Sequence, residues 1–431
     1  MGNGSGLQEA DFLELFSVNS ACTVQQARVC ALWLNLLRAH HGSHSYFLAQ
    51  LRGMMKDVIK RSHSRMKGIK TMKRLGILTG GGDAPGLNAV IRAAVKTAIS
   101  VYDCEVFGIR NGYDGFLDDD GIIPLGMEEV RGILPRGGTI LGSANRGNPY
   151  ARKIVRDGRE VTIDVSDEII KGINKLKLEA LLVLGGDGTL RIAHELWQKG
   201  VPVIGVPKTI DNDIGGTEIT FGFDTALNIA TEALDRLHTT AESHHRAMVL
   251  ELMGRDAGFI ALQAGISGGA DVILIPEIPF KFESIMVKIR ERAALGRKFS
   301  ILAVSEGAKP QNGTQIFSRK GDEIYVPRLG GIGQAVGEYI EQQGFESRVT
   351  VLGHLQRGGT PTSFDRSLAT RYGAAAVRLA AQGRFDRMVA LRCGRITDIP
   401  LEEAITIPKR VQLDDDAVVT ARSVGISFGD E

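Results

Sequence analysis

From residue 74 onwards, short apolar runs alternate with amphipathic stretches in a regular order. The run "RLGILT" leads into a glycine turn, and "LNAVIRAAVKTAI" follows with apolar positions at helical spacing. The same order returns in "LEALLVLGGDGTLRIAHELW". This repetition predicts strands connected by helices, which is the arrangement of a parallel sheet.

Four later segments have the same pattern. They are "VPVIGVPKTIDNDIGG", "HRAMVLELMGRDAGFIALQAGISGGADVILIPE", "KFSILAVSEGAK" and "SRVTVLGHLQRGGTPTSFDRSLATRYGAAAVRLA". Each begins with a strand, and the second and fourth also contain a helix. Strands that are apolar throughout indicate a sheet covered on both faces. We therefore predict an α/β fold with parallel strands, in which ligands bind beyond the carboxyl ends of the strands.

Residues 1–71 do not follow this pattern. "TVQQARVCALWLNLLRAHH" predicts an amphipathic helix, with Thr23 and Gln26 at capping-box spacing. The basic stretch that follows has no obvious core face. Three interpretations remain open: a flexible leader, a targeting segment, or a start codon placed too far upstream. A transit peptide fits least, because Glu9, Asp11 and Glu14 are acidic. We assign this extension no catalytic role.

The composition of the chain excludes some classes of binding partner. Lys+Arg 52 against Asp+Glu 50 gives a formal net charge of +2, which argues against nucleic acid or an anionic membrane as the main partner. No apolar run approaches the ~20 residues that span a bilayer. The four cysteines have no metal-binding spacing, so they predict reduced thiols in a cytoplasmic protein.

The two glycine turns are suited to phosphate. In "TGGGDAPG" and "LGGDGTL", residues without side chains let backbone N–H groups approach an anion at a helix N-terminus. Neither turn ends in GK[ST], so neither is a Walker A loop. Asp187 lies between two glycines, where a carboxylate can contact phosphate-bound Mg²⁺. It can equally be a helix N-cap, and both interpretations remain open.

The loop "VPKTIDND" carries Lys208, Thr209, Asp211 and Asp213 directly after an apolar run. Carboxylates this close repel each other, so a plain turn has no need of both. Phosphoryl transfer needs charge neutralisation, alignment and often a carboxylate that takes the acceptor's proton. The two aspartates could divide this work. The alternative is a polar turn that caps a strand.

Cationic side chains follow two other predicted strands. Arg255 lies in "MGRDAG", and His354 and Arg357 lie in "GHLQRGG" with Arg348 just upstream. Any one of them could be an ordinary surface residue or a satisfied core histidine. Together, at several strand ends, they match the charge of a sugar phosphate.

The motifs taken together resemble the 6-phosphofructokinase family. "GGGDAPGLNAVIR", "GGTILGSAN", "GGDGT", "PKTIDND", "GFDTA", "MGRDAG", "SEGA" and "VLGHLQRGG" occur in the family's order and spacing, from about residue 74 to about residue 387. The resemblance implies a glycolytic kinase with Mg²⁺ as cofactor. It also implies two Rossmann-like lobes with mostly parallel sheets flanked by helices, and an active-site cleft between the lobes.

On this resemblance, the chain divides into four parts. Residues 1–71 are an N-terminal extension of unknown role. Residues 72–222 together with 355–410 form the donor-binding lobe, and residues 223–354 form the sugar-phosphate-binding lobe. Residues 411–431 are a C-terminal tail.

The resemblance also assigns roles. Asp211 resembles the base that takes the proton from the 1-hydroxyl of fructose 6-phosphate, Thr209 lies beside it, and Arg255 stabilises the transferring phosphoryl group. Asp187 resembles the residue that contacts the metal. The residues expected at the donor are Gly81, Arg146, Gly186, Asp187, Gly188, Thr189 and Lys208. The residues expected at the sugar phosphate are Thr209, Asp211, Asp213, Arg246, Met253, Gly254, Arg255, Glu306, Arg348, His354 and Arg357.

Two of these arginines imply an oligomer. In the family, the positions matched by Arg246 and Arg348 reach the 6-phosphate of a neighbouring subunit. We therefore expect a homo-oligomer, a dimer or a tetramer, with substrate sites shared between subunits.

The donor is either ATP or pyrophosphate. Gly188 leaves room for the α-phosphate of ATP, where pyrophosphate-dependent members typically carry a second aspartate. Lys208 favours pyrophosphate. We give Gly188 more weight, because bulk and charge at this position act directly on the α-phosphate, and we predict ATP. A pyrophosphate-dependent enzyme and a non-catalytic sugar-phosphate-binding subunit remain as alternatives.

Two positions depart from the family. Asn145 occupies a place where many members have an arginine that bridges the substrates, and Arg146 follows it. An arginine often found in the family's effector site is His238 here, although Arg92 and Lys96 keep positive charge on the first helix. We expect weak or altered control by ADP.

Overall fold

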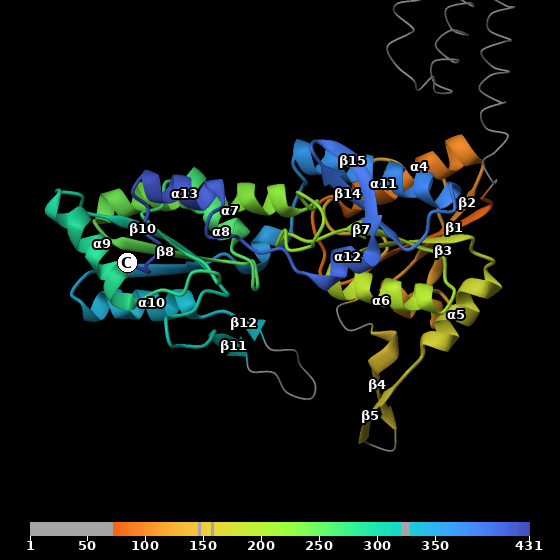
Figure 1. Cartoon of the computed structure of the whole chain (residues 1–431), viewed down its shortest axis with the longest axis horizontal. Helices are drawn as coiled ribbons and strands as arrows, with labels where there is room; N and C mark the ends of the chain where they lie inside the picture. The colour runs from red at the N-terminus through yellow and green to blue at the C-terminus, as the bar shows by residue number, and fades with distance from the viewer. Residues whose placement is uncertain (1–71, 145–147, 157–158, 320–327) are drawn as a thin grey trace, which may run out of the picture. The chain divides into compact units, whose positions relative to one another are not determined.

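The computed structural model describes residues 72–144, 148–156, 159–319 and 328–431 (Figure 1). The amphipathic helix predicted near the N-terminus, Asn145 and Arg146 lie outside the described residues. Within the described ranges, no helix combines the length and the apolar character needed to cross a membrane.

The first lobe is built on a sheet of seven strands in the order β15-β14-β7-β6-β1-β2-β3. Neighbouring strands are parallel except at the two edges, where β3 and β15 run antiparallel to their neighbours. The strands are β1 (Arg74–Thr79), β2 (Glu105–Ile109), β3 (Ile122–Pro124), β6 (Ala180–Gly185), β7 (Val203–Pro207), β14 (Arg387–Arg392) and β15 (Arg395–Pro400).

Helices cover both faces of this sheet. One face packs on α4 (Leu87–Tyr102) and α11 (Ser363–Ala381). The other face packs on α5 (Ser166–Lys175), α6 (Asp187–Gln198) and α12 (Leu401–Thr406). Because both faces are covered, the interior strands β6 and β7 are buried along their whole length, which is why they are apolar runs without alternation.

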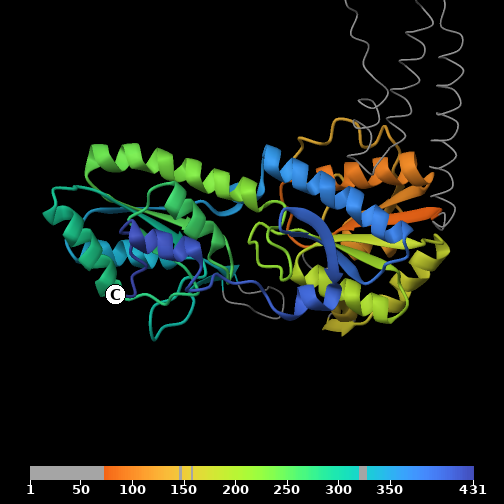
Figure 2. The same cartoon turned by 45° about the horizontal axis from the view of Figure 1, so that its top comes forward.

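The second lobe is built on a smaller, all-parallel sheet in the order β13-β8-β10-β9. Its strands are β8 (Ala247–Leu252), β9 (Val272–Leu274), β10 (Ser300–Ser305) and β13 (Ser347–Val351). One face packs on α7 (Phe223–His244), α8 (Phe259–Ser267) and α13 (Asp416–Ser423). The other packs on α9 (Phe282–Ala294) and α10 (Ile332–Gln342). Figure 2 shows α7 as the long green helix that runs along the second lobe.

Short elements complete the described part. Two hairpin-like pairs, β4 with β5 and β11 with β12, are antiparallel. Their bounds are β4 (Arg152–Arg156), β5 (Arg159–Ile163), β11 (Phe317–Arg319) and β12 (Arg328–Leu329), and the short 3-10 helices are η1 (Gly112–Phe116), η2 (Pro149–Ala151) and η3 (Gly353–Arg357).

The predicted α/β class, with mostly parallel sheets flanked by helices, is confirmed. Every strand predicted from an apolar run is present. Residues 411–431, which the sequence set apart as a tail, form α13 and contribute Phe428 to the core of the second lobe. A β-bridge joins Ser427 to Val272, the first residue of β9. The domain boundaries themselves stay a prediction.

Candidate active site

Three loops meet at the carboxyl ends of β1, β6 and β7. The N–H of Gly80, after β1, donates to the carbonyl of Leu184 at 2.9 Å, and the N–H of Lys208, after β7, donates to the carbonyl of Gly185 at 3.0 Å. The first glycine turn also forms a β-bridge to Ala144. Three motifs that are far apart in the sequence therefore lie side by side.

Thr189 is packed between the two glycine turns. A Cβ at Gly80 would lie 2.6 Å from the Thr189 Cγ2, and one at Gly185 would lie 2.4 Å from its Cβ. Side chains at either position would displace Thr189. A Cβ at Gly81, whose φ is +75°, would lie 3.4 Å from the Lys208 Nζ and 3.5 Å from the Thr189 Oγ1. Gly81, Thr189 and Lys208, all predicted to bind the donor, are thus brought together.

The second turn opens directly into α6. Gly186 is the N-cap, so the interpretation of Asp187 as an N-cap is wrong. Asp187 is the first helical residue, its side chain is 46% exposed, and Arg191 lies 3.4 Å from its Oδ1. A Cβ at Gly188 would meet no described atom within 4 Å. The start of α6 therefore presents a carboxylate beside open space.

Lys208 is buried in this group of loops, with 3% of its surface exposed. Its ammonium donates to the carbonyl oxygen of Gly82. Burial, followed by the nearby Arg357 charge, lowers the pKa of Lys208 to about 8, against the opposing pull of neighbouring aspartates. The side chain is therefore a charged group near neutral pH that has little competing water.

Thr209 and Asp211 form a local turn. The Thr209 Oγ1 accepts a hydrogen bond from the Asp211 N–H at 3.0 Å and lies 3.3 Å from the Asp211 Oδ2, to which it can donate. Asp211 is 3% exposed, and its Oδ1 has no hydrogen-bond partner among the described residues. A buried acceptor without a partner costs about 1–3 kcal/mol. One oxygen of this carboxylate is therefore held, and the other is available to a ligand.

Asn212 turns the chain between the two aspartates. Its φ is +53°, a left-handed conformation in which asparagine is several-fold enriched. Its Oδ1 accepts from the Thr220 N–H at 3.1 Å, and the Thr220 hydroxyl donates to the Thr209 carbonyl at 2.8 Å. Sequence reasoning missed Asn212, although an asparagine between two aspartates is a signal for such a turn.

Two carboxylates this close repel each other, and such repulsion raises the pKa of one of them. The pKa that is raised, to about 6, belongs to Asp213. Burial is the larger cause and the Asp211 charge is second, while Arg255 and Arg410 oppose the rise. The raised pKa is therefore that of the neighbour of Asp211, the residue expected to act as base.

A second group of residues follows β8 and β10. Arg255 has φ +53°, its N–H donates to the Glu306 Oε1 at 3.2 Å, and its side chain is exposed. A Cβ at Gly307 would lie 1.8 Å from the Arg255 carbonyl, so the "SEGA" glycine is required by this close approach. Burial raises the pKa of Glu306 to about 7, and the Asp211 charge contributes. The loops of both lobes thus influence one another.

The short helix η3 brings His354 and Arg357 to the same region. The Arg357 Nη1 donates to the Asp83 carbonyl at 3.1 Å, and a Cβ at Gly82 would lie 2.7 Å from it. Arg357 therefore lies against the first glycine turn. Its predicted contact with the sugar phosphate stays a prediction.

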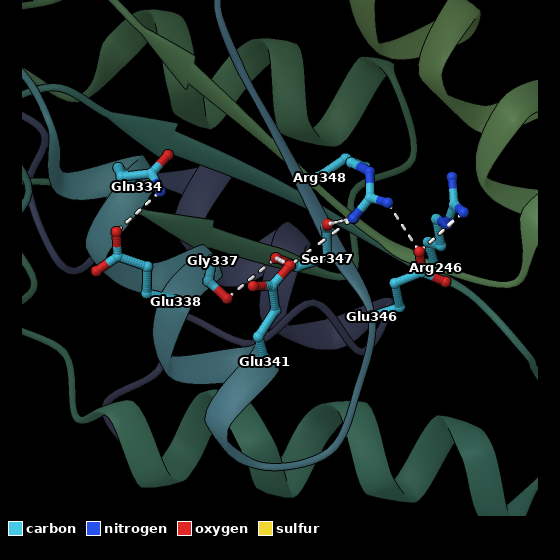
Figure 3. Close-up of polar contacts among 8 residues, drawn as sticks. All are labelled: Arg246, Gln334, Gly337, Glu338, Glu341, Glu346, Ser347 and Arg348. Carbon is cyan, nitrogen blue, oxygen red and sulfur yellow. Dashed lines mark hydrogen bonds and ion pairs between the residues drawn. The ribbon is translucent and has the colours of Figure 1, made fainter.

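Arg246 and Arg348 lie elsewhere. They stand at the amino ends of β8 and β13, where both contact the Glu346 Oε1 at 2.8 Å (Figure 3). The six residues of β8 separate Arg246 from Met253, which is about 20 Å at ~3.3 Å per residue. The structure therefore does not bring these two arginines to the other site residues of the same chain.

Comparison with known proteins identifies the family. The model of the phosphofructokinase family matches residues 74–380. The chain belongs to the phosphofructokinase family. The predicted resemblance is therefore confirmed.

Three similar proteins illustrate the match. The "ATP-dependent 6-phosphofructokinase" of Chloroflexus aggregans is 54% identical over 83% of this chain and 98% of its own length. The "Pyrophosphate--fructose 6-phosphate 1-phosphotransferase" of Amycolatopsis mediterranei is 48% identical over 79% of this chain and 97% of its own length. The T-state structure of Pichia pastoris phosphofructokinase matches with a TM-score of 0.67 and 31% identity, over 78% of this chain and 36% of that longer one.

Two further residues of this chain support the site, and sequence reasoning missed both. Gln356 is fully buried, and its Oε1 accepts from the Met253 N–H at 3.3 Å. Asp365, in the first turn of α11, accepts from the N–H groups of Gly222 at 2.9 Å and Thr225 at 2.8 Å, which fixes the start of α7. Their backbone partners are remote in sequence, so no local pattern marks either residue.

Two other features of the chain lie outside this group. A cavity of about 470 Å³ runs along α7 and the loop before α11, lined by Thr225, Asn228, Ile229, Thr231, Glu232, Asp235, Gly358, Gly359, Thr360 and Thr362, and includes no predicted site residue. The His238 Nε2 lies 2.7 Å from the Gly268 carbonyl. Within the described ranges, no three acidic, histidine or cysteine side chains are grouped to hold a metal ion.

Proposed function

We propose that this chain is an ATP-dependent 6-phosphofructokinase, which transfers the γ-phosphoryl group of Mg-ATP to the 1-hydroxyl of fructose 6-phosphate. One observation carries the proposal: Asp211 is buried at the end of β7, with one carboxylate oxygen tied to Thr209 and the other without a partner among the described residues. Cationic and glycine-rich loops surround it, as a phosphoryl-transfer site requires.

Asp211 acts as the general base. Its unpartnered Oδ1 accepts the proton of the 1-hydroxyl as that oxygen attacks the phosphoryl group. The Thr209 hydroxyl and the turn at Asn212 fix the direction of the carboxylate. Because the carboxylate is already oriented, binding the sugar does not require it to be ordered.

The donor lies over the two glycine turns. The backbone of Gly81, the start of α6 and the Thr189 side chain face one another there, and Lys208 supplies buried positive charge. The open space at Gly188 accommodates the α-phosphate of ATP. This space supports ATP over pyrophosphate, and the name of the Chloroflexus aggregans relative agrees.

Mg²⁺ is the expected cofactor. The available oxygen ligands suit this ion, because Mg²⁺ prefers oxygen and is usually held by one or two carboxylates together with substrate phosphates. Asp187 would hold it, and water and the donor phosphates would complete its coordination. When bound, the ion would neutralise charge on the donor phosphates.

Arg255 stabilises the transferring phosphoryl group. The left-handed backbone at Arg255 and the hydrogen bond to Glu306 hold its loop, while the guanidinium remains exposed for a ligand. Met253 and Glu306 contact the sugar, and His354 and Arg357 bind the 6-phosphate together with Arg246 and Arg348 of the partner subunit. We therefore propose a homo-oligomer, because Arg246 and Arg348 stand at the amino ends of their strands, about 20 Å from the site of their own chain.

We also propose that the enzyme works in the cytoplasm. The described cysteines, Cys104 and Cys393, are free thiols, which suits a reducing compartment.

A pyrophosphate-dependent enzyme is the second candidate. It is favoured by Lys208, which lies against the first glycine turn, and by the name of the Amycolatopsis mediterranei relative. A donor exchange separates the two. Purified protein is supplied with fructose 6-phosphate and Mg²⁺, and formation of fructose 1,6-bisphosphate is followed with ATP and with pyrophosphate. We expect turnover with ATP. Turnover with pyrophosphate alone would select the second candidate, and no turnover with either would favour a non-catalytic sugar-phosphate-binding subunit.

A further inference from the structure

A single segment of the chain contacts active-site loops of both lobes. We call residues 407–412, the first part of the connection between α12 (Leu401–Thr406) and α13 (Asp416–Ser423), the inter-lobe strap. At its first-lobe end, the Lys409 N–H donates to the carbonyl of Asp213 at 2.8 Å. The Lys409 ammonium donates to the carbonyl of Glu218 at 2.5 Å and lies 5.0 Å from the centroid of the Phe259 ring. The strap is therefore fixed to the loop that carries the two aspartates.

The other end of the strap reaches the loop that carries Arg255. The Val411 N–H donates to the Glu277 Oε1 at 3.0 Å, and the same carboxylate accepts from the Gly258 N–H at 3.0 Å. The Arg410 Nη2 lies 3.9 Å from the Asp256 Oδ2. Glu277 and Asp256 thus connect the strap to the residues directly after Arg255.

Asp256 is held from two sides. Its Oδ1 accepts from the Gln315 amide at 2.9 Å, and its Oδ2 faces Arg410. Gln315 also donates to the Gly307 carbonyl at 3.2 Å, next to Glu306. Movement of Arg410 would therefore be transmitted through Asp256 to the backbone of Arg255.

The ion pair of Arg410 contributes little to stability by itself. The Arg410 side chain is 33% exposed, and its contact with Asp256 is as long as 3.9 Å. Exposed ion pairs of this kind add little to stability. Its position has a more specific consequence. The positive charges of Arg410 and Arg255, which come from different segments, both oppose the rise of the Asp213 pKa.

We propose that Arg410 is a positioning residue, which uses the inter-lobe strap to hold the Arg255 loop at a fixed distance from the aspartate loop. This inference rests on the proposed function, because it assigns the transfer of a phosphoryl group to these two loops. Misplacing a reacting group by about 1 Å can cost a rate factor of ~10². The strap supplies the required precision from outside both loops.

The test compares Arg410→Met with Arg410→Lys and with a matched control, Arg395→Met, which removes an exposed arginine at the start of β15. For Arg410→Met we expect kcat to fall by about 10- to 100-fold while KM for both substrates stays within about threefold. The thermal midpoint should change by less than about 2 °C. Arg410→Lys should recover part of kcat, and Arg395→Met should match the wild type.

A double variant tests the route through Asp256. If Arg410 acts through this residue, Asp256→Asn combined with Arg410→Met should lose no more activity than the more damaged single variant. A kcat of Arg410→Met within about twofold of the wild type would overturn the proposal. So would a raised KM at unchanged kcat, which belongs to a substrate contact, or a loss of activity that only follows a loss of stability.

A second measurement does not depend on turnover. Backbone hydrogen exchange in peptides covering residues 213–218 and 253–258 should be faster in Arg410→Met than in Arg395→Met. Unchanged exchange in both peptides would overturn the proposal. If the wild type is inactive with both donors, the proposed function fails, and the exchange result still decides whether the strap orders the two loops.

Discussion

The two edges of the second sheet carry arginines in opposite situations. At the carboxyl edge, Arg255 sits on a loop with φ +53°, tied through its N–H to Glu306, and its guanidinium is exposed. At the amino edge, Arg246 and Arg348 share the carboxylate of Glu346. Hydrogen bonding from Arg246 and the two positive charges hold the pKa of Glu346 below its usual range. One edge presents an open cation, and the other presents two paired cations.

Strand direction accounts for this difference. The strands of the sheet are parallel, so residues before each strand gather at one edge and residues after each strand gather at the other. Arg246 and Arg255 are neighbours in the sequence, yet β8 lies between them. Within one chain, Arg255 at the carboxyl edge therefore lies beside Glu306, whereas Arg246 stands at the other end of β8. The proposal that the arginines at the amino edge complete a site on a second chain follows from this separation.

The largest expected effect is at Asp211, the proposed base. Asp211→Asn should lower kcat by about 10²- to 10⁴-fold, because a positioned general base contributes that much. KM for fructose 6-phosphate should change much less. Steady-state kinetics with both substrates varied checks this. Asp224→Asn, an acidic change in the first turn of α7, serves as a control, and near-normal turnover in Asp211→Asn would remove Asp211 from the mechanism.

The next effect separates the two edges directly. Arg255→Ala should lower kcat by about 10²- to 10³-fold, as expected when a donor to developing charge is removed. Its KM for fructose 6-phosphate should change by less than its kcat. The two parameters are measured together in initial-rate assays, and a variant whose loss lies in KM alone would assign Arg255 to ground-state binding.

At the amino edge, the loss should appear in substrate binding. Arg348→Ala should raise KM for fructose 6-phosphate by about 10- to 100-fold, because a charge-assisted hydrogen bond is worth roughly 1.5–3 kcal/mol. Mixing it with Asp211→Asn sharpens the test. After subunit exchange, some shared sites would combine the intact Asp211 of an Arg348→Ala subunit with the intact Arg348 of an Asp211→Asn subunit. Part of the activity should then return. Mixtures that stay as inactive as their components would contradict a shared site.

Donor choice should respond to bulk at one glycine. Gly188→Asp places a carboxylate in the open space at the start of α6. We expect kcat/KM for ATP to fall by about 10- to 100-fold, because a like charge beside phosphate is repelled and desolvated. Parallel assays with pyrophosphate give the comparison. An effect on donor choice should lower kcat/KM for ATP and leave kcat/KM for pyrophosphate unchanged. An equal decrease of kcat/KM with both donors would instead indicate damage to the turn.

The smallest effect concerns pH. Burial raises the pKa of Glu306 from 4.5 to about 7, so the folded state holds this proton more tightly than the unfolded state. Its contribution is complete below pH 4.5 and is lost as the pH rises to about 7. The thermal midpoint of the ligand-free protein should therefore decrease as the pH is raised from 4.5 to about 7. Glu306→Gln should make this decrease smaller. Lys208 adds little to this slope, because its pKa is lowered only to about 8.

The sequence predicted the strands and both glycine turns well, because buried parallel strands are read as continuous apolar runs. It predicted less of what holds the site in place. Gln356, Asp365 and Arg410 act on backbone or side chains more than a hundred positions away. Such pairs follow from the tertiary fold and not from local pattern. Asn212 is different, since its left-handed turn has a local signal that could have been read.

The position of α13 near the end of the chain determines which lobe completes its core last during synthesis. The core of the second lobe combines residues of β8, α7 and α8 with Val418 and Phe428, which are synthesised more than 140 residues after α8 ends at Ser267. The interior strands of the first sheet are complete by β14. Since domains form as units during synthesis, the second lobe completes its core only when α13 has been made, after every strand of the first sheet. A ribosome that stalls after β15 would therefore leave the core between α7, α8 and the second sheet without α13 and Phe428, and chaperones could bind this exposed part in that interval.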